Sequence, residues 1–206
     1  MISRIKGYYF ITDSGLSRSG NIEDVKAAVR SGVKVVQYRN KHASSRQMFV
    51  EALQLRDICK DIVFIVNDRV DIALAVGADG VHLGQDDLPC PSARRLLGKS
   101  RLIGVTVRTI QEAEKALADG ADYIAAAPVF ATSTKTDAGK PVGTGFVREL
   151  KKVYKVPVAA IGGITLENAK SVVGAGADSI CAISCVVTKE DAAAEIRKFQ
   201  KLFARQ

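Results

Sequence analysis

One loop of this chain carries the residue types that proteins use to bind phosphate. The stretch 130–145, FATSTKTDAGKPVGTG, contains three consecutive hydroxyl side chains, Thr132, Ser133 and Thr134, followed directly by Lys135. Glycines within the loop allow its backbone to approach a ligand closely. Hydroxyls, free backbone N–H groups and an ammonium ahead of a helix form an anion cradle, and phosphate is its commonest occupant. A polar loop without a ligand would have the same composition, so the loop alone leaves both interpretations open.

A second set of polar side chains follows the second apolar run of the chain. Within VKVVQYRNK, residues two apart share one face of a strand, so Gln37, Arg39 and Lys41 point the same way. Val36 and Tyr38 point the other way and suit packing against a helix. Two cations and an amide are costly to bury without an anionic partner. Either a bound anion or a network of ion pairs with neighbouring strands would satisfy them.

Carboxylates end the next two apolar runs, in IVFIVNDRVD and GVHLGQDD. Asp68 lies in the first of these stretches, and Asp86 and Asp87 lie in the second. These acids could pair with Arg39 and Lys41, or they could hold Mg2+, which takes one or two carboxylates plus waters and substrate phosphate oxygens. Cations, carboxylates and a phosphate loop at one opening favour a site for a metal ion and a diphosphate.

The elements that would position these residues alternate along the chain. Apolar, β-branched runs recur near 8–12, 33–38, 62–66, 80–83, 101–107, 122–129, 156–161 and 178–184. Helical periodicity fills the intervals, at 22–31, 45–60, 70–76, 91–97, 110–118, 146–153, 166–173 and 190–203. This alternation predicts parallel strands joined by crossover helices, and eight repeats within 206 residues favour a closed (β/α)8 TIM barrel. In such a barrel the active site gathers at the carboxyl ends of the strands, where the polar residues above fall.

Weaker signals come from three later positions and from one histidine. Thr106 is polar within an apolar run, and Gly163 and Ser184 follow the last two runs, where barrels of this kind often bind phosphate. Along its own run, His82 alternates with the residues that share the face of Asp87. We therefore expect His82 to be a hydrogen-bonded structural histidine rather than a catalytic one.

A short internal repeat and the lack of a linker bear on domain organisation. Gly-Ala-Asp recurs at 77–79, 120–122 and 176–178, each time between a predicted helix and the next predicted strand. Glycine suits the C-terminal stop of a helix. Because no linker or change of composition divides the chain, we expect residues 1–206 to form a single domain.

Bulk composition excludes several classes of function. The chain is 47% hydrophobic and 25% charged, as in an ordinary globular protein. No apolar run approaches the roughly 20 residues of a membrane span, and the N-terminus lacks a signal-peptide core, so we expect a cytoplasmic protein without a membrane partner. The net charge of +8 suits phosphorylated small molecules, and without a long basic run we expect no nucleic-acid partner. The oligomeric state stays open, a homo-oligomer included.

Taken together, the motifs resemble the thiamine phosphate synthase family. They fall in the family's order over nearly the whole chain, as VQYRNK, VNDRVDIA, GVHLGQDD, GADYI, PVFATSTKTD, VPVAAIGGI and AISCV. The resemblance implies a compact barrel and a Mg2+-dependent transferase of thiamine biosynthesis. Such an enzyme joins 4-amino-2-methyl-5-hydroxymethylpyrimidine diphosphate to 4-methyl-5-(2-phosphoethyl)thiazole, or to its carboxylated form, and releases pyrophosphate. Its dissociative reaction needs charge neutralisation and orientation rather than a nucleophile.

The resemblance also implies roles for individual residues. The pyrimidine diphosphate would be bound by Gln37, Arg39, Lys41, Asn67, Thr106 and Lys135. The thiazole phosphate would be bound by Thr132, Thr134, Gly163, Ile183 and Ser184. Mg2+ would be held by Asp68 and Asp87. Among these residues, catalytic roles on the leaving group would fall to Arg39, Thr106 and Lys135.

Two departures from the family pattern and two alternative functions remain at this stage. Ala125–Ala127 stand where the family often has glycines, which predicts a narrower opening, and Thr106 replaces the usual serine. A thiazole tautomerase would share the barrel but have a histidine where Arg108 stands. A non-catalytic phosphate-binding barrel would have no need of the carboxylates Asp68 and Asp87.

Overall fold

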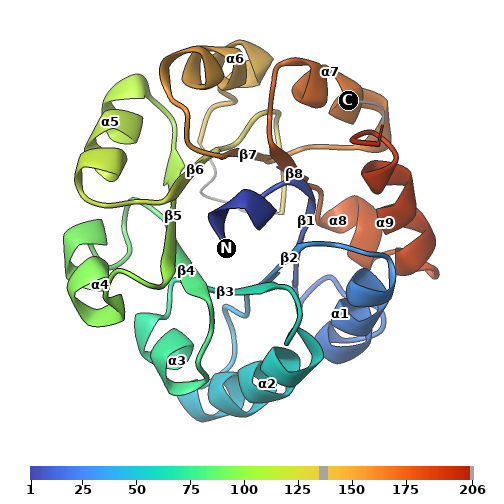
Figure 1. Cartoon of the computed structure of the whole chain (residues 1–206). Helices are drawn as coiled ribbons and strands as arrows, with labels where there is room; N and C mark the ends of the chain where they lie inside the picture. Colours follow the sequence, from blue (N-terminus) through green and yellow to red (C-terminus); the bar gives the residue numbers. More distant parts are fainter. Residues whose placement is uncertain (135–138, 205–206) are drawn as a thin grey trace.

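The computed structural model describes residues 1–134 and 139–204, and its strands form a closed parallel barrel (Figure 1). The strands are β1 (Gly7–Ile11), β2 (Val35–Tyr38), β3 (Val63–Asn67), β4 (Gly80–Leu83), β5 (Leu102–Val107), β6 (Tyr123–Ala126), β7 (Val158–Ile161) and β8 (Ser179–Cys181). Each strand pairs with the next along the chain, and β8 pairs with β1 to close the barrel. The predicted (β/α)8 barrel is confirmed.

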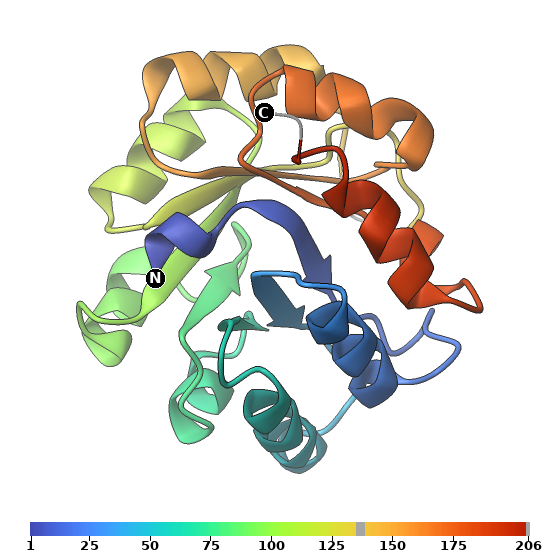
Figure 2. The same ribbon diagram turned by 45° about the vertical axis from the view of Figure 1, so that its right-hand side comes forward.

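Helices surround the barrel and connect its strands. They are α1 (Asn21–Arg30), α2 (Ser45–Ile58), α3 (Val70–Ala75), α4 (Cys90–Leu97), α5 (Ile110–Ala118), α6 (Gly143–Val153), α7 (Leu166–Gly174), α8 (Ser184–Val187) and α9 (Ala192–Gln200), preceded by the short 3-10 helix η1 (Ile2–Arg4). The last helix, α9, packs beside α1 on the outside of the barrel (Figures 1 and 2). This contact joins the two ends of the chain.

Alternation along each strand divides the core into two parts. In β2, Val35 belongs to the cluster inside the barrel, whereas Val36 and Tyr38 pack against the surrounding helices. The side assigned to these residues from the sequence is therefore confirmed. Ile5 packs into the interior cluster just before β1, and η1 lies across the same end of the barrel in Figure 1. The amino ends of the strands are thus covered, and the carboxyl ends face the other way.

Three of the element boundaries that differ from the sequence predictions bear on the site. Strand β6 ends at Ala126 rather than near 129, and α6 begins at Gly143 rather than near 146. The start of α6 is tied back to the end of β6, because the N–H of Gly143 donates to the carbonyl of Val129 at 3.0 Å. Ser184 is the first residue of α8 and not the end of a strand. A short β-branched run such as CVV fits either a strand or a buried helical turn, and packing decides between them.

The Gly-Ala-Asp repeat makes the same interaction at three places. The Asp79, Asp122 and Asp178 carboxylates accept backbone N–H bonds from the neighbouring strand, from Phe64 at 2.8 Å, Ile103 at 2.7 Å and Val158 at 2.7 Å. Each carboxylate also pairs with a cation of a preceding helix, Arg56, Arg94 or Lys151, at 2.9, 2.6 and 2.7 Å. The glycine of each motif has a positive φ, which suits the helix stop. One aspartate therefore links two strands and a helix at the amino end of the barrel.

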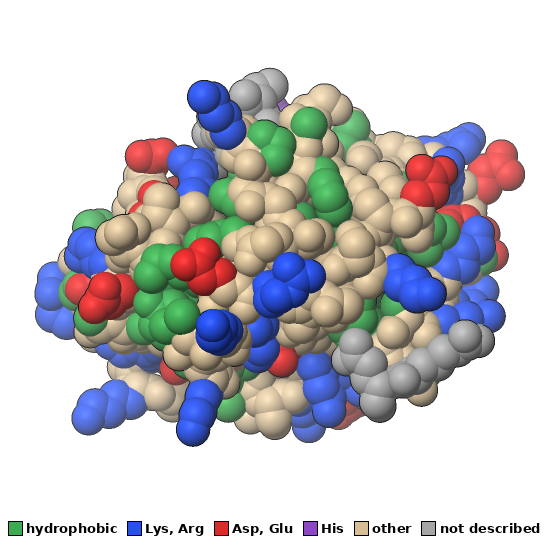
Figure 3. All heavy atoms as spheres, turned by 90° about the horizontal axis from the view of Figure 1, so that it is seen from above, with side chains coloured by type: hydrophobic (Ala, Val, Ile, Leu, Met, Phe, Trp, Pro, Cys, Tyr) green, Lys and Arg blue, Asp and Glu red, His purple; other side chains and the backbone are tan. Residues whose placement is uncertain are grey.

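Charged side chains of both signs share the molecular surface. On the face seen in Figure 3, Lys and Arg side chains are interspersed with Asp and Glu and with apolar patches. The excess positive charge of the chain is thus not gathered into one band on that face. Across the described residues, no helix is both long and apolar enough to span a membrane.

We predict that Asp122→Ala lowers the free energy of unfolding by about 2 kcal/mol, because it leaves the Ile103 N–H without its charged acceptor and removes the partner of Arg94. The control is Asp119→Ala, which breaks an ion pair to Lys115, a side chain that is 74% exposed. Exposed pairs of this kind contribute less than about 1 kcal/mol. Urea unfolding of both variants measures the difference, and equal losses would contradict the role given to the repeat.

Candidate active site

A cavity of about 640 Å³ opens at the carboxyl ends of the strands. Side chains from all the strands line it, including Tyr9, Gln37, Asn67, His82, Thr106, Ala125, Ile161 and Cys181. Every site residue expected from the sequence that the structure describes also lines this cavity: Gln37, Arg39, Lys41, Asn67, Asp68, Asp87, Thr106, Thr132, Thr134, Gly163, Ile183 and Ser184. Lys135 lies outside the described residues. The structure therefore brings the expected residues together in one place.

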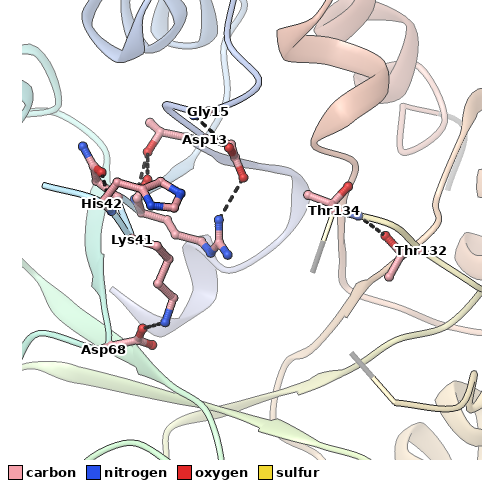
Figure 4. Close-up of polar contacts among 10 residues, drawn as sticks. Asp13, Gly15, Lys41, His42, Asp68, Thr132 and Thr134 are labelled. Carbon is pink, nitrogen blue, oxygen red and sulfur yellow. Dashed lines mark hydrogen bonds and ion pairs between the residues drawn. The ribbon is translucent and has the colours of Figure 1, made fainter. Parts of the chain in front are cut away.

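Arg39 is held in the cavity wall by a carboxylate that the sequence analysis missed. Its Nη1 donates to Asp13 Oδ2 at 2.8 Å, and both side chains are largely buried, at 19% and 11% exposure. Thr12, directly after β1, fixes the Arg39 backbone, accepting its N–H at 2.8 Å and donating to its carbonyl at 3.1 Å. Asp13 in turn accepts the N–H of Gly15 at 3.2 Å (Figure 4). Asp13 follows the first apolar run as Asp68 follows the third, so the same reasoning would have found it.

Lys41 and two carboxylates form a neighbouring group. The Lys41 ammonium donates to Asp68 (Figure 4), and Asp87 Oδ2 accepts the N–H of Gly84 at 2.7 Å. Burial raises the pKa of Asp87, and the adjacent Asp68 raises it further through a hydrogen bond and its charge, while the Gly84 N–H and the Lys41 charge lower it. Two carboxyl groups that close together favour a shared cation.

The donor set suits Mg2+. Within 1–134 and 139–204, no three His, Cys, Asp or Glu side chains gather into a closed metal cage. Mg2+ is commonly held by one or two carboxylates, with waters and substrate phosphates completing its shell. Asp68 and Asp87 at the edge of an open cavity offer that arrangement. Lys41 already supplies one positive charge to the pair.

Asp68 has an unusual backbone conformation. Its φ of 60° is the only positive value for a non-glycine residue in the described part of the chain. Aspartate tolerates this left-handed region better than most residues, but at some cost in energy. The N–H of Asp68 donates to the carbonyl of His82 at 2.8 Å, which fixes the turn between β3 and α3 against β4. Strain of this kind is often found at functional sites, because surrounding contacts are needed to maintain it.

His82 lies inside the barrel rather than on the side facing the helices. Its neighbours Val81 and Leu83 pack against the helices, whereas His82 lines the cavity floor. The hydrogen bonding expected of it is present, with Nδ1 3.1 Å from Tyr123 Oη and Nε2 2.9 Å from Thr106 Oγ1. Extending the alternation of β4 to Asp87 gave His82 the face opposite to that of Asp87, yet both residues line the cavity. The strand ends at Leu83, so the alternation does not continue through the turn that follows.

Gln37 and Tyr9 continue this floor, and Tyr123 is fully buried inside the barrel beside them. Gln37 Nε2 donates to Tyr9 Oη at 2.8 Å, and Tyr9 Oη lies 2.9 Å from Tyr123 Oη. Gly104 provides the room, since a Cβ at this position would lie 2.1 Å from Cζ of the Tyr123 ring. Burial raises the pKa of Tyr9 and of Tyr123, so both phenols keep their protons. Tyrosines at 9 and 123 read as ordinary strand residues in the sequence, where nothing shows that they meet.

The opposite wall holds the part of the phosphate loop that the structure describes. Gly162 and Gly163 have φ values of 101° and 62°, and a Cβ on Gly163 would lie 2.3 Å from the carbonyl oxygen of Ala131. Only glycine therefore lets β7 approach the segment after β6. That close contact brings Thr132 and Thr134 to the cavity, across from Lys41 and Asp68 in Figure 4.

The alanines of β6 affect the cavity differently from the prediction. Ala125 and Ala127 line the cavity, but Ala126 is fully buried among the residues that face the helices. The expected narrowing of the opening is therefore wrong for Ala126, because alternate residues of a strand point to opposite faces.

Comparison with known proteins gives a consistent result. Residues 8–186 match the protein-family model described as thiamine monophosphate synthase. The chain is 49% identical over 199 residues to the thiamine-phosphate synthase of Methanosarcina barkeri, covering 96% of this chain and 90% of that protein. It is 50% identical over 197 residues to the thiamine-phosphate synthase of Chloroflexus aurantiacus, covering 94% of this chain and 91% of that protein. Among solved structures, thiamine phosphate pyrophosphorylase from Pyrococcus furiosus has a TM-score of 0.91 at 36% identity, covering 100% of this chain and 98% of that one.

The backbone of Asp68 gives a prediction that does not depend on activity. Asp68→Gly and Asp68→Ala remove the same carboxylate, but only glycine adopts a positive φ freely, so we expect the alanine variant to be less stable by about 1 kcal/mol. Asp71 lies within α3, where glycine is the poorer residue, so Asp71→Gly should be less stable than Asp71→Ala. Urea unfolding of the four variants tests this reversal, and the same order at both positions would contradict it.

Proposed function

The chain belongs to the thiamine monophosphate synthase family and is therefore a transferase that forms thiamine phosphate, and we propose that the cavity at the carboxyl ends of its strands is the active site. Its substrates would be 4-amino-2-methyl-5-hydroxymethylpyrimidine diphosphate and 4-methyl-5-(2-phosphoethyl)thiazole or its carboxylated form. The products would be thiamine phosphate and pyrophosphate.

The observation that carries this proposal is the presence of two anion-binding groups on opposite walls of one cavity. Arg39, Lys41 and the carboxylate pair Asp68 and Asp87 come from the β2–β4 side. The hydroxyls of the phosphate loop, together with Gly163, Ile183 and Ser184, come from the β6–β8 side. A reaction between a diphosphate and a phosphate ester needs two such groups facing one another. On this basis the first group binds the pyrimidine diphosphate and the second binds the thiazole phosphate.

The chemistry needs no nucleophilic side chain. The electron-rich aminopyrimidine expels diphosphate to form a stabilised cation, and the thiazole nitrogen captures this cation. Arg39 and Lys41 neutralise the charge that develops on the leaving group, and Thr106 donates a hydrogen bond to it. Family resemblance gives Lys135 a similar role. Mg2+ bound at Asp68 and Asp87 would neutralise further charge on the diphosphate. Gln37 and Asn67 orient the pyrimidine, so that the two reacting atoms meet in the cavity.

Arg108 supports this reading over a thiazole tautomerase, which would have a histidine at that position. Arg108 lines the cavity, and its Nε is buried without a hydrogen-bond partner among the described residues. A buried guanidinium edge of this kind favours an anionic ligand. The relatives reported above are thiamine-phosphate synthases, so neither the tautomerase nor the non-catalytic barrel is favoured.

The direct test is the release of pyrophosphate and the formation of thiamine phosphate from the two substrates. We expect both products in equal amounts, with turnover lost when Mg2+ is chelated. Asp68→Asn should reduce turnover sharply and raise the Mg2+ concentration needed, because it removes one charge from the proposed ligand pair. Asp71→Asn, which changes an exposed carboxylate of α3, is the matched control. Wild-type kinetics in Asp68→Asn would refute the metal assignment.

The Arg39 guanidinium should matter for its shape as well as its charge. Arg39 binds Asp13 through one nitrogen and keeps other donors free for the diphosphate, whereas lysine offers a single point charge. We expect Arg39→Lys to lower kcat/KM for the pyrimidine diphosphate by about 10-fold or more, with the KM for the thiazole phosphate unchanged. Arg56→Lys, at the other end of the barrel, is the control for an arginine paired with aspartate. A change confined to the thiazole KM would place Arg39 in the other subsite.

A further inference from the structure

Five polar side chains from five strands are hydrogen-bonded in sequence across the cavity floor. In order, they are Gln37 of β2, Tyr9 of β1, Tyr123 of β6, His82 of β4 and Thr106 of β5. The first four are buried, with exposures of 3%, 1%, 0% and 9%. The first and last members carry proposed substrate contacts, whereas the proposed function gives no role to the three between them.

One direction of these hydrogen bonds uses each phenolic proton on another member of the series. An amide nitrogen can only donate, so Gln37 Nε2 supplies a proton to Tyr9 Oη. Tyr9 has a single phenolic proton, and the Tyr123 oxygen, 2.9 Å away, can accept it. In this direction the single proton of Tyr123 goes to His82 Nδ1. Because burial raises the pKa of both tyrosines, each remains a donor.

The same direction determines the state of the histidine and of the threonine. A His82 ring that accepts at Nδ1 and is neutral carries its proton on Nε2, and it donates this proton to Thr106 Oγ1. The Thr106 hydroxyl proton is then directed away from His82. Thr106 lines the cavity, so this proton is available to a ligand bound there.

We propose that Tyr9, Tyr123 and His82 are positioning residues that hold His82 as the neutral Nε2–H tautomer and so direct the Thr106 hydroxyl proton to the diphosphate leaving group. The proposal rests on the proposed function. The same hydrogen bonds leave the side-chain oxygen of Gln37, an acceptor, for the cavity, where it would accept from the amino group of the pyrimidine.

If these hydrogen bonds ran in the opposite direction, from Thr106 to Gln37, they would suit the substrate at neither end. If every bond were reversed, Gln37 would present N–H groups to the amino group of the pyrimidine. Thr106 would present an oxygen lone pair to the negatively charged diphosphate. Both contacts would be repulsive. A substrate with an amine at one end and a diphosphate at the other therefore fits only the direction of hydrogen bonding that runs from Gln37 to Thr106. Hydrogen-bond donors fixed before the reaction stabilise a leaving group without reorganisation.

The tautomer can be read directly by 15N NMR of the imidazole nitrogens. The chain has two histidines, so His42→Gln leaves His82 as the single imidazole signal. We expect Nδ1 at the chemical shift of an unprotonated nitrogen and Nε2 at that of a protonated one. Tyr123→Phe should shift the Nδ1 signal and mix the tautomers. A protonated Nδ1, or a cationic ring at the assay pH, would refute the proposal, whether or not the protein makes thiamine phosphate.

Kinetics test whether this series of hydrogen bonds acts through Thr106. We expect Tyr123→Phe to lower kcat by about 10-fold, with the KM for the thiazole phosphate unchanged. The control is Tyr8→Phe, which removes another buried phenol. The Tyr8 hydroxyl donates to the carbonyl of Ala182 at 2.6 Å and takes no part in the hydrogen bonds between Gln37 and Thr106. Tyr8→Phe should lose stability but keep about the wild-type kcat. Equal effects of the two variants on kcat would overturn the proposal.

A double-mutant cycle gives the sharpest test. In a Thr106→Val background the hydroxyl is absent, so adding Tyr123→Phe should lower kcat no further. Thr106→Ser keeps the hydroxyl and should restore the effect of Tyr123→Phe. Independent losses in the Thr106→Val background would show that Tyr123 acts by another route, which refutes the proposal. A wild-type protein that forms no thiamine phosphate would instead refute the proposed function, while the NMR result would still stand.

Discussion

Burial of polar groups inside the barrel is the constraint on which the site depends. An amide, two phenols and an imidazole lie at the floor of the cavity, where each would cost free energy if its hydrogen bonds were left unmade. Their partners come from different strands, so they are satisfied only when the barrel is closed and the strands are in register. Gly104 is needed for the Tyr123 ring to fit. The floor therefore has one arrangement, which fixes the positions of the side chains above it.

The two ends of the barrel use charge in different ways. At the amino ends, Asp79, Asp122 and Asp178 each satisfy a strand N–H and a helix cation, so their charges are used in stabilising the fold. At the carboxyl ends, Asp68 and Asp87 lie side by side, and the backbone of Asp68 is strained. Such a carboxylate pair lowers stability unless cations offset its charge, and Lys41 supplies one positive charge to it. The separation lets one end hold the barrel together while the other end binds ligands.

Periodicity was enough to predict the barrel and most of the site, because alternation along a strand places residues such as Gln37 and Arg39 at the cavity. It failed where the backbone stops being regular. His82 was misplaced because the alternation was continued past the end of β4, and Ser184 was assigned to a strand although it begins α8. Tyr9 and Tyr123 were missed for another reason. They are 114 residues apart in the chain, and a single sequence does not show which strands will bring them together.

A site whose charges are already paired suits a reaction that passes through a cation. Arg39 and Lys41 are held by Asp13 and Asp68, so their positions are set within the protein before any anion arrives. A leaving diphosphate then meets charges that need little reorganisation, which is the main source of electrostatic catalysis. The interior side chains below it are mostly apolar or hydrogen-bonded to one another, and burial raises the pKa of the Cys181 thiol, which lines the same floor, so that it keeps its proton. The cation formed from the pyrimidine would therefore find the thiazole nitrogen as its partner, because orientation in the cavity leaves that atom closest.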